Sequence, residues 1–209
     1  GARGAGVSIF GLNEQHTLIL VDGQRTTGRI AGGVDTRRCD LTNVEQIEVV
    51  KGSASALYGS EAIGGVINII PRRAKRNLEL FIRPTYGSQN TFDLNLAAGT
   101  KYKNLNSYFT GGFHRTDGFS IATEDDPDPI GDTVPQSDSW NVENRTQYQI
   151  TERFAWNFRG DFRQESISAV DARPSGAVFD RTQRTDVLSV TTGPELRIGN
   201  TGRFRMWLT

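Results

Sequence analysis

The stretch RFAWNFRGDFR, residues 153–163, puts aromatic and charged side chains at alternate positions. Neighbouring side chains of an extended strand point to opposite faces, so one face receives the rings and the other the charges. The first face holds Phe154, Trp156, Phe158, Gly160 and Phe162. The second face holds Arg153, Asn157, Arg159, Asp161 and Arg163. An aqueous core would not be lined by that second set, so the pattern predicts a strand between lipid and a polar lumen.

Residues 77–209 contain further strand-like segments that are longer than the usual soluble strand of ~5 or 6 residues. They cover residues 78–87, 91–100, 106–116, 139–150, 185–198 and 203–208. Every second connection is short, and two of the others are predicted to be long polar loops, residues 117–138 and Ile167–Arg184. This rhythm is typical of an outer-membrane barrel with periplasmic turns and extracellular loops. Aromatic residues near strand ends are expected to form its girdle: Tyr102, Trp140, Tyr148 and Trp207. A soluble β-sandwich is the alternative, because its strands also recur at about 8–12 residues.

Charge and composition exclude several classes of protein. Lys and Arg together number 24, as do Asp and Glu, so no positive excess exists to bind nucleic acid. No apolar run reaches the ~18 residues of a membrane-spanning helix. Cys39 is the single cysteine, which rules out an internal disulfide and a Cys-based zinc site. The chain opens without a signal peptide and stops within a strand-like segment, so we expect a fragment.

The stretch VEQIEVVKGSASALYGSEAIGGVINII, residues 44–70, interrupts two apolar strands with Gly, Ser and Ala. Ser53 is expected to cap a single helical turn over residues 54–57, and Gly59 to supply the left-handed residue that ends it. Pro71 then ends the second strand. Small residues at these positions allow close backbone packing. An ordinary α/β corner is the structural alternative, since glycine has many uses.

This stretch, together with TLILVDGQR (residues 17–25) before it, resembles the plug domain of TonB-dependent outer-membrane receptors. The resemblance covers about residues 7–73 and is nearly continuous over Ala54–Ile70. The chain departs from the family pattern at four positions: Phe10 and Lys51 replace Arg, Ser53 replaces Pro, and Pro71 replaces Thr. Lys51 keeps its positive charge but loses the bidentate fork of arginine.

The resemblance implies a mainly β fold in two domains. Residues 1–76 would form the α+β plug domain without its N-terminal part. Residues 77–209 would form the first six or seven antiparallel strands of a transmembrane barrel of about 22 strands, whose lumen the plug blocks. The implied function is TonB-dependent transport of a scarce nutrient across the Gram-negative outer membrane. A ferric siderophore is the first expected ligand, with haem and cobalamin as alternatives. No enzymatic activity and no cofactor are expected, because no catalytic motif is present.

Four arginines follow the LVDG strand and are expected to meet an anionic ligand through charge-assisted hydrogen bonds. They are Arg25, Arg29, Arg37 and Arg38. The alternative is that they solvate their loop or pair with the barrel wall.

The plug motif residues expected to shape the domain are Glu48, Lys51, Gly52, Tyr58, Gly59, Gly64 and Gly65. Of these, Glu48 and Lys51 are candidates for ion pairs with the barrel, the alternative being simple solvation in a wet lumen.

No metal site is expected, although the acidic loop contains three candidate calcium ligands, Asp125, Asp126 and Asp128. Calcium prefers oxygen ligands, but the spacing differs from an EF-hand, and Pro127 and Pro129 favour an extended segment. A further functional alternative is a passive pore or an adhesin-like barrel, which needs no energy coupling. A TonB box upstream of this sequence would argue against it.

Overall fold

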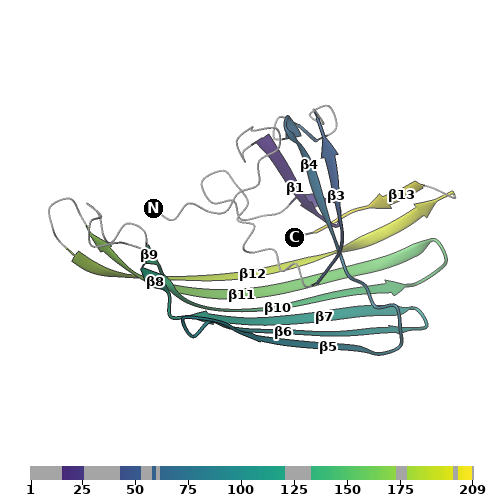
Figure 1. Ribbon diagram of the computed structural model, residues 1–209. Coiled ribbons are helices and arrows are strands. Elements are labelled where there is room, and N and C mark those ends of the chain that lie inside the picture. The colour runs from purple at the N-terminus through teal and green to yellow at the C-terminus, as the bar shows by residue number, and fades with distance from the viewer. Residues whose placement is uncertain are drawn as a thin grey trace. The chain divides into compact units, whose positions relative to one another are not determined.

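The computed structural model describes residues 16–25, 43–52, 58–59, 62–120, 133–172, 178–199 and 202–208. It divides into two compact units, residues 1–73 and residues 74–209, and each contains its own main sheet (Figure 1). In the described part of the chain, no helix has the length and apolar character needed to cross a membrane.

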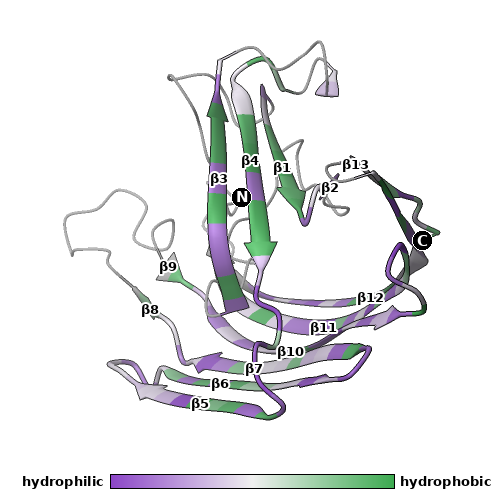
Figure 2. Cartoon of the chain, turned by 90° about the vertical axis from the view of Figure 1, so that its right-hand side faces the viewer, coloured by the Kyte–Doolittle hydropathy of each residue, from purple (hydrophilic) through white to green (hydrophobic). Residues whose placement is uncertain are grey.

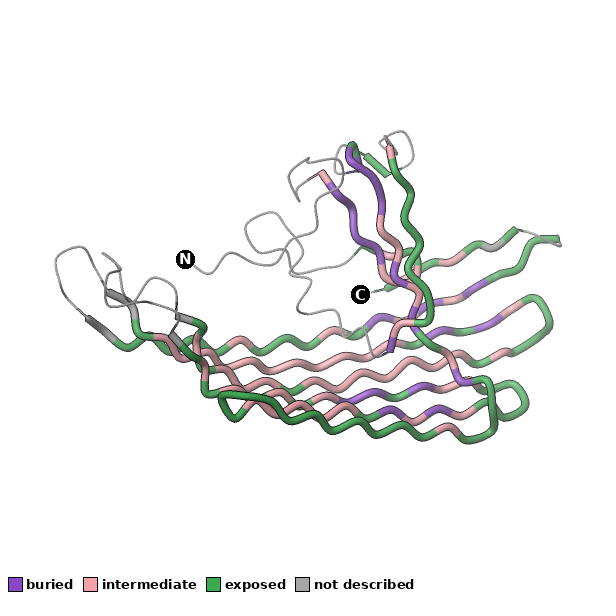
Figure 3. Tube along the Cα trace, in the orientation of Figure 1, coloured by how far each residue is buried: buried purple, intermediate pink, exposed green. Residues whose placement is uncertain are grey.

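The first unit contains a four-stranded sheet of order β2-β1-β4-β3. Its strands are β1 (Thr17–Val21), β2 (Gln24–Arg25), β3 (Val44–Lys51) and β4 (Gly65–Pro71). The two central strands, β1 and β4, run parallel, while β3 pairs antiparallel with β4. β1 and much of β4 are buried, whereas the edge strand β3 is exposed (Figure 3). The two strands predicted on either side of the small-residue run are thus neighbours in one sheet.

Local sequence explains the shape of this sheet. Leu18 and Leu20 of β1 form its apolar core with Ala62 and Val66. Asp22 and Gly23 form a tight turn, since both adopt positive φ, 52° and 80°, and fold β2 back onto β1.

The second unit contains a seven-stranded antiparallel sheet of order β13-β12-β11-β10-β7-β6-β5. Its strands are β5 (Glu79–Tyr86), β6 (Phe92–Tyr102), β7 (Leu105–Thr116), β10 (Gln136–Gln149), β11 (Phe154–Ala172), β12 (Val178–Ile198) and β13 (Gly202–Arg205). Two short strands, β8 (Phe119–Ser120) and β9 (Thr133–Val134), pair with each other in the connection between β7 and β10. The mainly β fold with long antiparallel strands is confirmed.

The predicted long loop at Ile167–Arg184 is wrong. β11 continues to Ala172 and β12 begins at Val178, so strand pairing fills most of that range. Polar side chains misled the prediction, because they indicate where a strand leaves lipid and not where it ends. Backbone hydrogen bonds hold a hairpin together in water as well as in a membrane.

The two ends of the seven-stranded sheet differ. The connections at residues 103–104, 150–153 and 199–201 define its hairpin end. The connections at residues 87–91, 117–135 and 173–177 define its loop end. The shortest turn needs a left-handed residue, which Lys103 supplies with a φ of 49°.

Hydrophobic and hydrophilic residues alternate along the strands of this sheet (Figure 2). Apolar side chains lie on its exposed face, and polar ones are buried on the other face. Leu188 on the apolar face is 73% exposed, and Phe109, Trp156 and Phe158 are also exposed. On the polar face, the buried residues include Thr110, Asn157, Thr191 and Glu195. A soluble sandwich would bury its aromatic residues, so that alternative is wrong. The distribution matches a barrel wall that faces lipid, and the seven-stranded sheet is called the wall from here on.

Exposed aromatic residues mark both borders of the apolar face. Tyr148 pairs with Trp156 near the hairpin end, and Trp140 lies eight residues before Tyr148, toward the loop end. The indole N–H of Trp156 donates to Thr192 Oγ1 at 2.8 Å, as expected for a ring between lipid and water. Trp207 does not belong to this girdle. Its neighbour Leu208 bridges to Thr192 of the apolar face, so Trp207 belongs to the polar face.

The loop-side border of the apolar face shifts in one direction across the sheet, in two steps. On β6, β7, β10, β11 and β12 it lies at Phe92, Phe113, Trp140, Phe162 and Leu188. In the pairing register, the border moves by two residues between β6 and β7 and by two more between β10 and β11. The average is one residue per strand. A shift of ~3.3 Å for each ~4.8 Å strand spacing corresponds to a strand tilt of about 35°, the tilt of membrane barrels.

Candidate functional site

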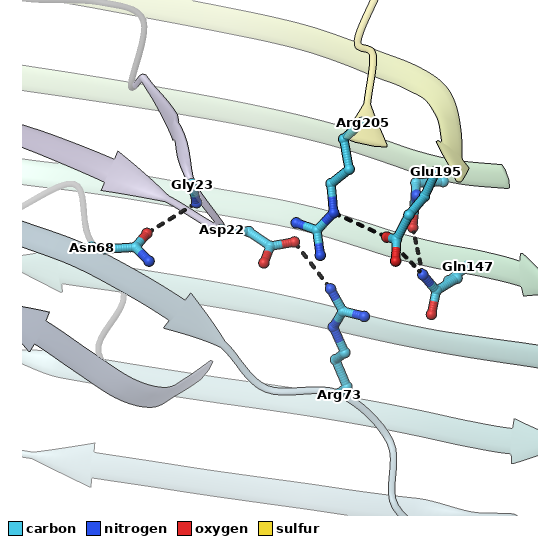
Figure 4. A network of polar contacts seen from close by, with 8 residues as sticks. Asp22, Gly23, Asn68, Arg73, Gln147, Glu195 and Arg205 are labelled. Atoms are coloured by element: carbon cyan, nitrogen blue, oxygen red, sulfur yellow. Dashed lines mark hydrogen bonds and ion pairs between the residues drawn. The ribbon is translucent and has the colours of Figure 1, made fainter. Parts of the chain in front are cut away.

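The Asp22–Gly23 turn is held by contacts with β4 and with Arg73, which lies two residues beyond β4. Gly23 N donates to Asn68 Oδ1 at 2.9 Å, and Asp22 N donates to the Ile69 carbonyl at 2.9 Å. The carboxylate of Asp22 forms an ion pair with Arg73 at 3.1 Å (Figure 4). The turn at Asp22 and Gly23 is therefore fixed to β4 and to Arg73, two residues beyond it.

Asn68 also connects this turn to the opposite edge of the sheet. Its Nδ2 donates to Glu48 Oε2 at 2.9 Å, and Gln46 Nε2 reaches the other oxygen of Glu48 at 3.4 Å. The carboxylate of Glu48 thus has partners inside its own sheet. Its predicted ion pair with the barrel, and that of Lys51, stay predictions.

Arg25 and Tyr58, both identified from the sequence, contact each other. The guanidinium of Arg25 donates from Nη2 to the Tyr58 carbonyl. A Cβ at Gly59 would lie 3.7 Å from the same Nη2, and Gly59 has a φ of 87°. Gly59 therefore supplies the predicted left-handed residue, and Arg25 is hydrogen-bonded to the residue directly before it. This contact gives Arg25 a structural role that the sequence did not indicate.

The other motif residues have local structural roles. Gly52 has a φ of 94°, and Gly65 has a φ of 143° and pairs with Lys51. Gly64 N donates to the His16 carbonyl at 2.9 Å. The remaining predicted features lie outside the described residues: Arg29, Arg37, Arg38, the helical turn at 53–57, and the calcium candidates Asp125, Asp126 and Asp128.

The polar face of the seven-stranded sheet contains a cluster of alternating charges on β10 and β11. Glu143 contacts Arg145 Nη2 and Arg159 Nε, each at 2.7 Å. Arg159 also lies 3.6 Å from Asp161. All four side chains are less than a third exposed, so the acids and bases offset each other's desolvation.

A second polar cluster lies nearer the hairpin end. Glu195 is 2% exposed and accepts a hydrogen bond from Arg205 Nε at 3.0 Å (Figure 4). Gln147 Nε2 donates to Asn157 Oδ1 at 3.0 Å and reaches Glu195 at 3.4 Å. Four strands thus contribute to one hydrogen-bonded group.

In the described residues, no group of three His, Cys, Asp or Glu side chains could hold a metal ion. The sole pairing of a histidine with an acid there joins His114 Nδ1 to Asp93 Oδ1 at 2.6 Å.

Residues 1–66 match the family model described as TonB-dependent Receptor Plug Domain. This match includes β1, β2 and β3 and ends at the start of β4, and the seven-stranded sheet follows it in the chain. The chain belongs to the TonB-dependent receptor family.

Curated relatives of this receptor include vitamin B12 transporters. The transporter BtuB of Vibrio cholerae is 41% identical over 101 residues, which cover 47% of this chain and 16% of that protein. BtuB of Vibrio vulnificus is 30% identical over 168 residues, 77% of this chain and 26% of that protein. The receptor chain therefore spans about a quarter or less of the relatives it matches.

Solved structures of the same fold include iron and copper transporters. The FrpB iron transporter from Neisseria meningitidis has a TM-score of 0.67 at 16% identity, covering 92% of this chain and 32% of that one. The ferric enterobactin receptor PfeA from Pseudomonas aeruginosa gives 0.62 at 20% identity, with 92% and 32% coverage. The copper transporter OprC gives 0.61 at 18%, with 89% and 28% coverage. At these identities the likeness concerns the fold.

Sequence reasoning missed the residues that organise the receptor's polar clusters. Asn68 stands within an apolar strand, VINII, and that isolated amide was the available signal. Arg73 lies just beyond β4 and contacts a residue 51 positions earlier, which no local pattern reveals. The partners of Glu195 and Arg159 follow from strand register.

Proposed function

We propose that this receptor takes up a scarce nutrient across the outer membrane of a Gram-negative bacterium, driven by TonB. The observation that carries the proposal is the combination of a plug sheet with a wall that exposes apolar residues and buries polar ones. A wall of this kind suits lipid on one side and a wet lumen on the other. A plugged lumen requires energy input for passage.

The proposed ligand class is a metal-containing nutrient complex. Ferric siderophores are the general expectation for this family, and haem is a further alternative. The vitamin B12 transporters among the curated relatives add cobalamin, because 41% identity in the matched segment exceeds the identity to any siderophore receptor named above. We therefore place cobalamin first in the experiment and ferric siderophores second.

Uptake in cells tests the proposal. The full receptor is expressed in a Gram-negative strain that lacks its own cobalamin and siderophore receptors. Labelled cyanocobalamin, ferric enterobactin and haem are supplied at nanomolar concentration, with and without TonB. We expect one ligand to accumulate only when TonB is present.

Two results would contradict the proposal. Accumulation that is independent of TonB and rises linearly with ligand concentration would indicate a passive pore. Binding to the cell surface without any accumulation would indicate an adhesin-like protein. A protonophore distinguishes these cases, since it stops energised uptake and leaves passive diffusion unchanged.

A further inference from the structure

The segment of residues 74–78, here called the connector, is bonded along its length although it forms no strand. The Ala74 carbonyl accepts from Asn106 Nδ2 at 2.8 Å, and the Arg76 carbonyl accepts from Lys101 N at 2.8 Å. The Asn77 carbonyl accepts from Thr100 Oγ1 at 2.7 Å. Residues of β6 and β7 thus satisfy three connector carbonyls near the hairpin end of the wall.

Glu79 completes this arrangement from the first residue of β5. Its Oε1 accepts hydrogen bonds from Lys75 N at 2.6 Å and from Arg76 N at 2.8 Å. A carboxylate that accepts two consecutive backbone N–H groups forms charge-assisted bonds, which are stronger than neutral ones. Glu79 therefore fixes the backbone of the connector directly before β5.

The wall is shaped to accept Ala74. This residue is 3% exposed and packs against Ala97 and Tyr108. Gly99 lies between them, and a Cβ at Gly99 would come within 3.1 Å of Ala74 Cβ and 2.7 Å of Tyr108 Cδ2. A side chain at position 99 would displace the connector, so Gly99 leaves the space that Ala74 occupies.

Just before the connector, the contact with the Asp22–Gly23 turn is an ion pair between two partly exposed side chains. The Arg73–Asp22 ion pair joins side chains that are 42% and 31% exposed. Water and salt weaken such a pair, whereas five hydrogen bonds involve the backbone of the connector, so the ion pair opens more readily than the connector detaches.

We propose that Glu79 is a positioning residue that keeps the connector bound to the wall while the plug rearranges. Remodelling then stops at Arg73, and the wall keeps hold of residues 74–78 throughout transport. The docking of the connector stands on its own contacts, whereas the remodelling rests on the proposed function.

The docking is tested in the resting full-length receptor. A cysteine is introduced by Ala74→Cys in a Cys39→Ser background, and its alkylation by a maleimide is timed. Adding Glu79→Ala should increase the labelling rate by about tenfold, because two charge-assisted bonds are lost. Glu79→Gln should fall between, since it keeps a neutral acceptor. Glu152→Ala, in the exposed turn between β10 and β11, is the matched control and should change nothing.

Amide hydrogen exchange gives a readout that needs no cysteine. The N–H of Lys101 donates to the connector, so Glu79→Ala should speed its exchange, while neighbouring wall amides keep their rates. These wall amides also show whether the variant has folded. If labelling at position 74 and exchange at Lys101 both stay unchanged in a folded Glu79→Ala receptor, the inference is wrong.

The remodelling is tested in energised cells with a second reporter, Ala62→Cys, whose parent residue is fully buried in the plug core. With ligand and TonB present, position 62 should become reactive while position 74 keeps its resting rate. Parallel increases at both positions would overturn the inference. If neither position responds to energy, the proposed function and the remodelling claim both fail, and the resting experiment alone then decides the docking.

Discussion

Asn68 joins Glu48 to the opposite side of the plug sheet, donating to its carboxylate at 2.9 Å while accepting from Gly23 N at 2.9 Å. One amide thereby couples the edge strand β3 to the turn that precedes the arginine-rich loop. The position of Gly23 consequently depends on a side chain in β4.

We expect Asn68→Ala to destabilise the plug by about 1–2 kcal/mol, since two hydrogen bonds are lost at a partly exposed site. Hydrogen exchange at Gly23 should accelerate in the full receptor. Gln46→Ala is the control, because its hydrogen bond to Glu48 is long, at 3.4 Å, and its loss should have little effect. Equal effects of the two substitutions would show that Asn68 has no special role.

Gly65→Ala should impair folding of the plug. Gly65 is buried and has a φ of 143°, a conformation that costs an alanine about 1–3 kcal/mol. Limited proteolysis of the full receptor should then cut the plug faster. Gly87→Ala serves as the control, because Gly87 has no positive φ and its nearest neighbour would be 3.8 Å away. Unchanged proteolysis of the Gly65→Ala receptor would contradict the prediction.

Two arginine substitutions on the apolar side of β12 should differ in cost. Leu188→Arg puts a charge inside the apolar border and should destabilise the wall by up to about 2–4 kcal/mol. Thr182→Arg, six residues toward the loop end, has the same facing but lies beyond the border, where the cost is about 0–1 kcal/mol. Urea unfolding in lipid vesicles measures both. Similar losses would place the border elsewhere.

The buried pair of Glu195 and Arg205 should respond asymmetrically to substitution. Arg205→Leu leaves a carboxylate that is 2% exposed without this partner, and we expect a loss of about 3 kcal/mol. Glu195→Gln should cost less, because it removes the buried charge. The double variant should recover part of the stability lost in Arg205→Leu, again measured by unfolding in vesicles. Additive losses would show that the two groups act independently.

The sequence was sufficient for strand type and facing, and insufficient for long-range partners. Alternation across residues 153–163 predicted which side of β11 carries Phe158 and which carries Arg159, because strand geometry has a period of two. The Arg25–Tyr58 contact depends on tertiary folding over 33 positions, so the sequence suggested a ligand role that its observed partner does not require. The ends of β11 and β12 were missed because polarity reports the surrounding solvent and not the backbone conformation.

The stagger of the apolar border also determines how wide a closed wall would be. Strands that lean by about 35° each occupy more of the circumference than upright ones, so a ring of about 22 such strands would measure roughly 40 Å across. An unobstructed opening of that width would pass antibiotics, bile salts and small proteins alike. A wall with this stagger therefore cannot act as a selective barrier by itself. The cell's protection against toxic solutes depends on what fills the lumen of the closed barrel.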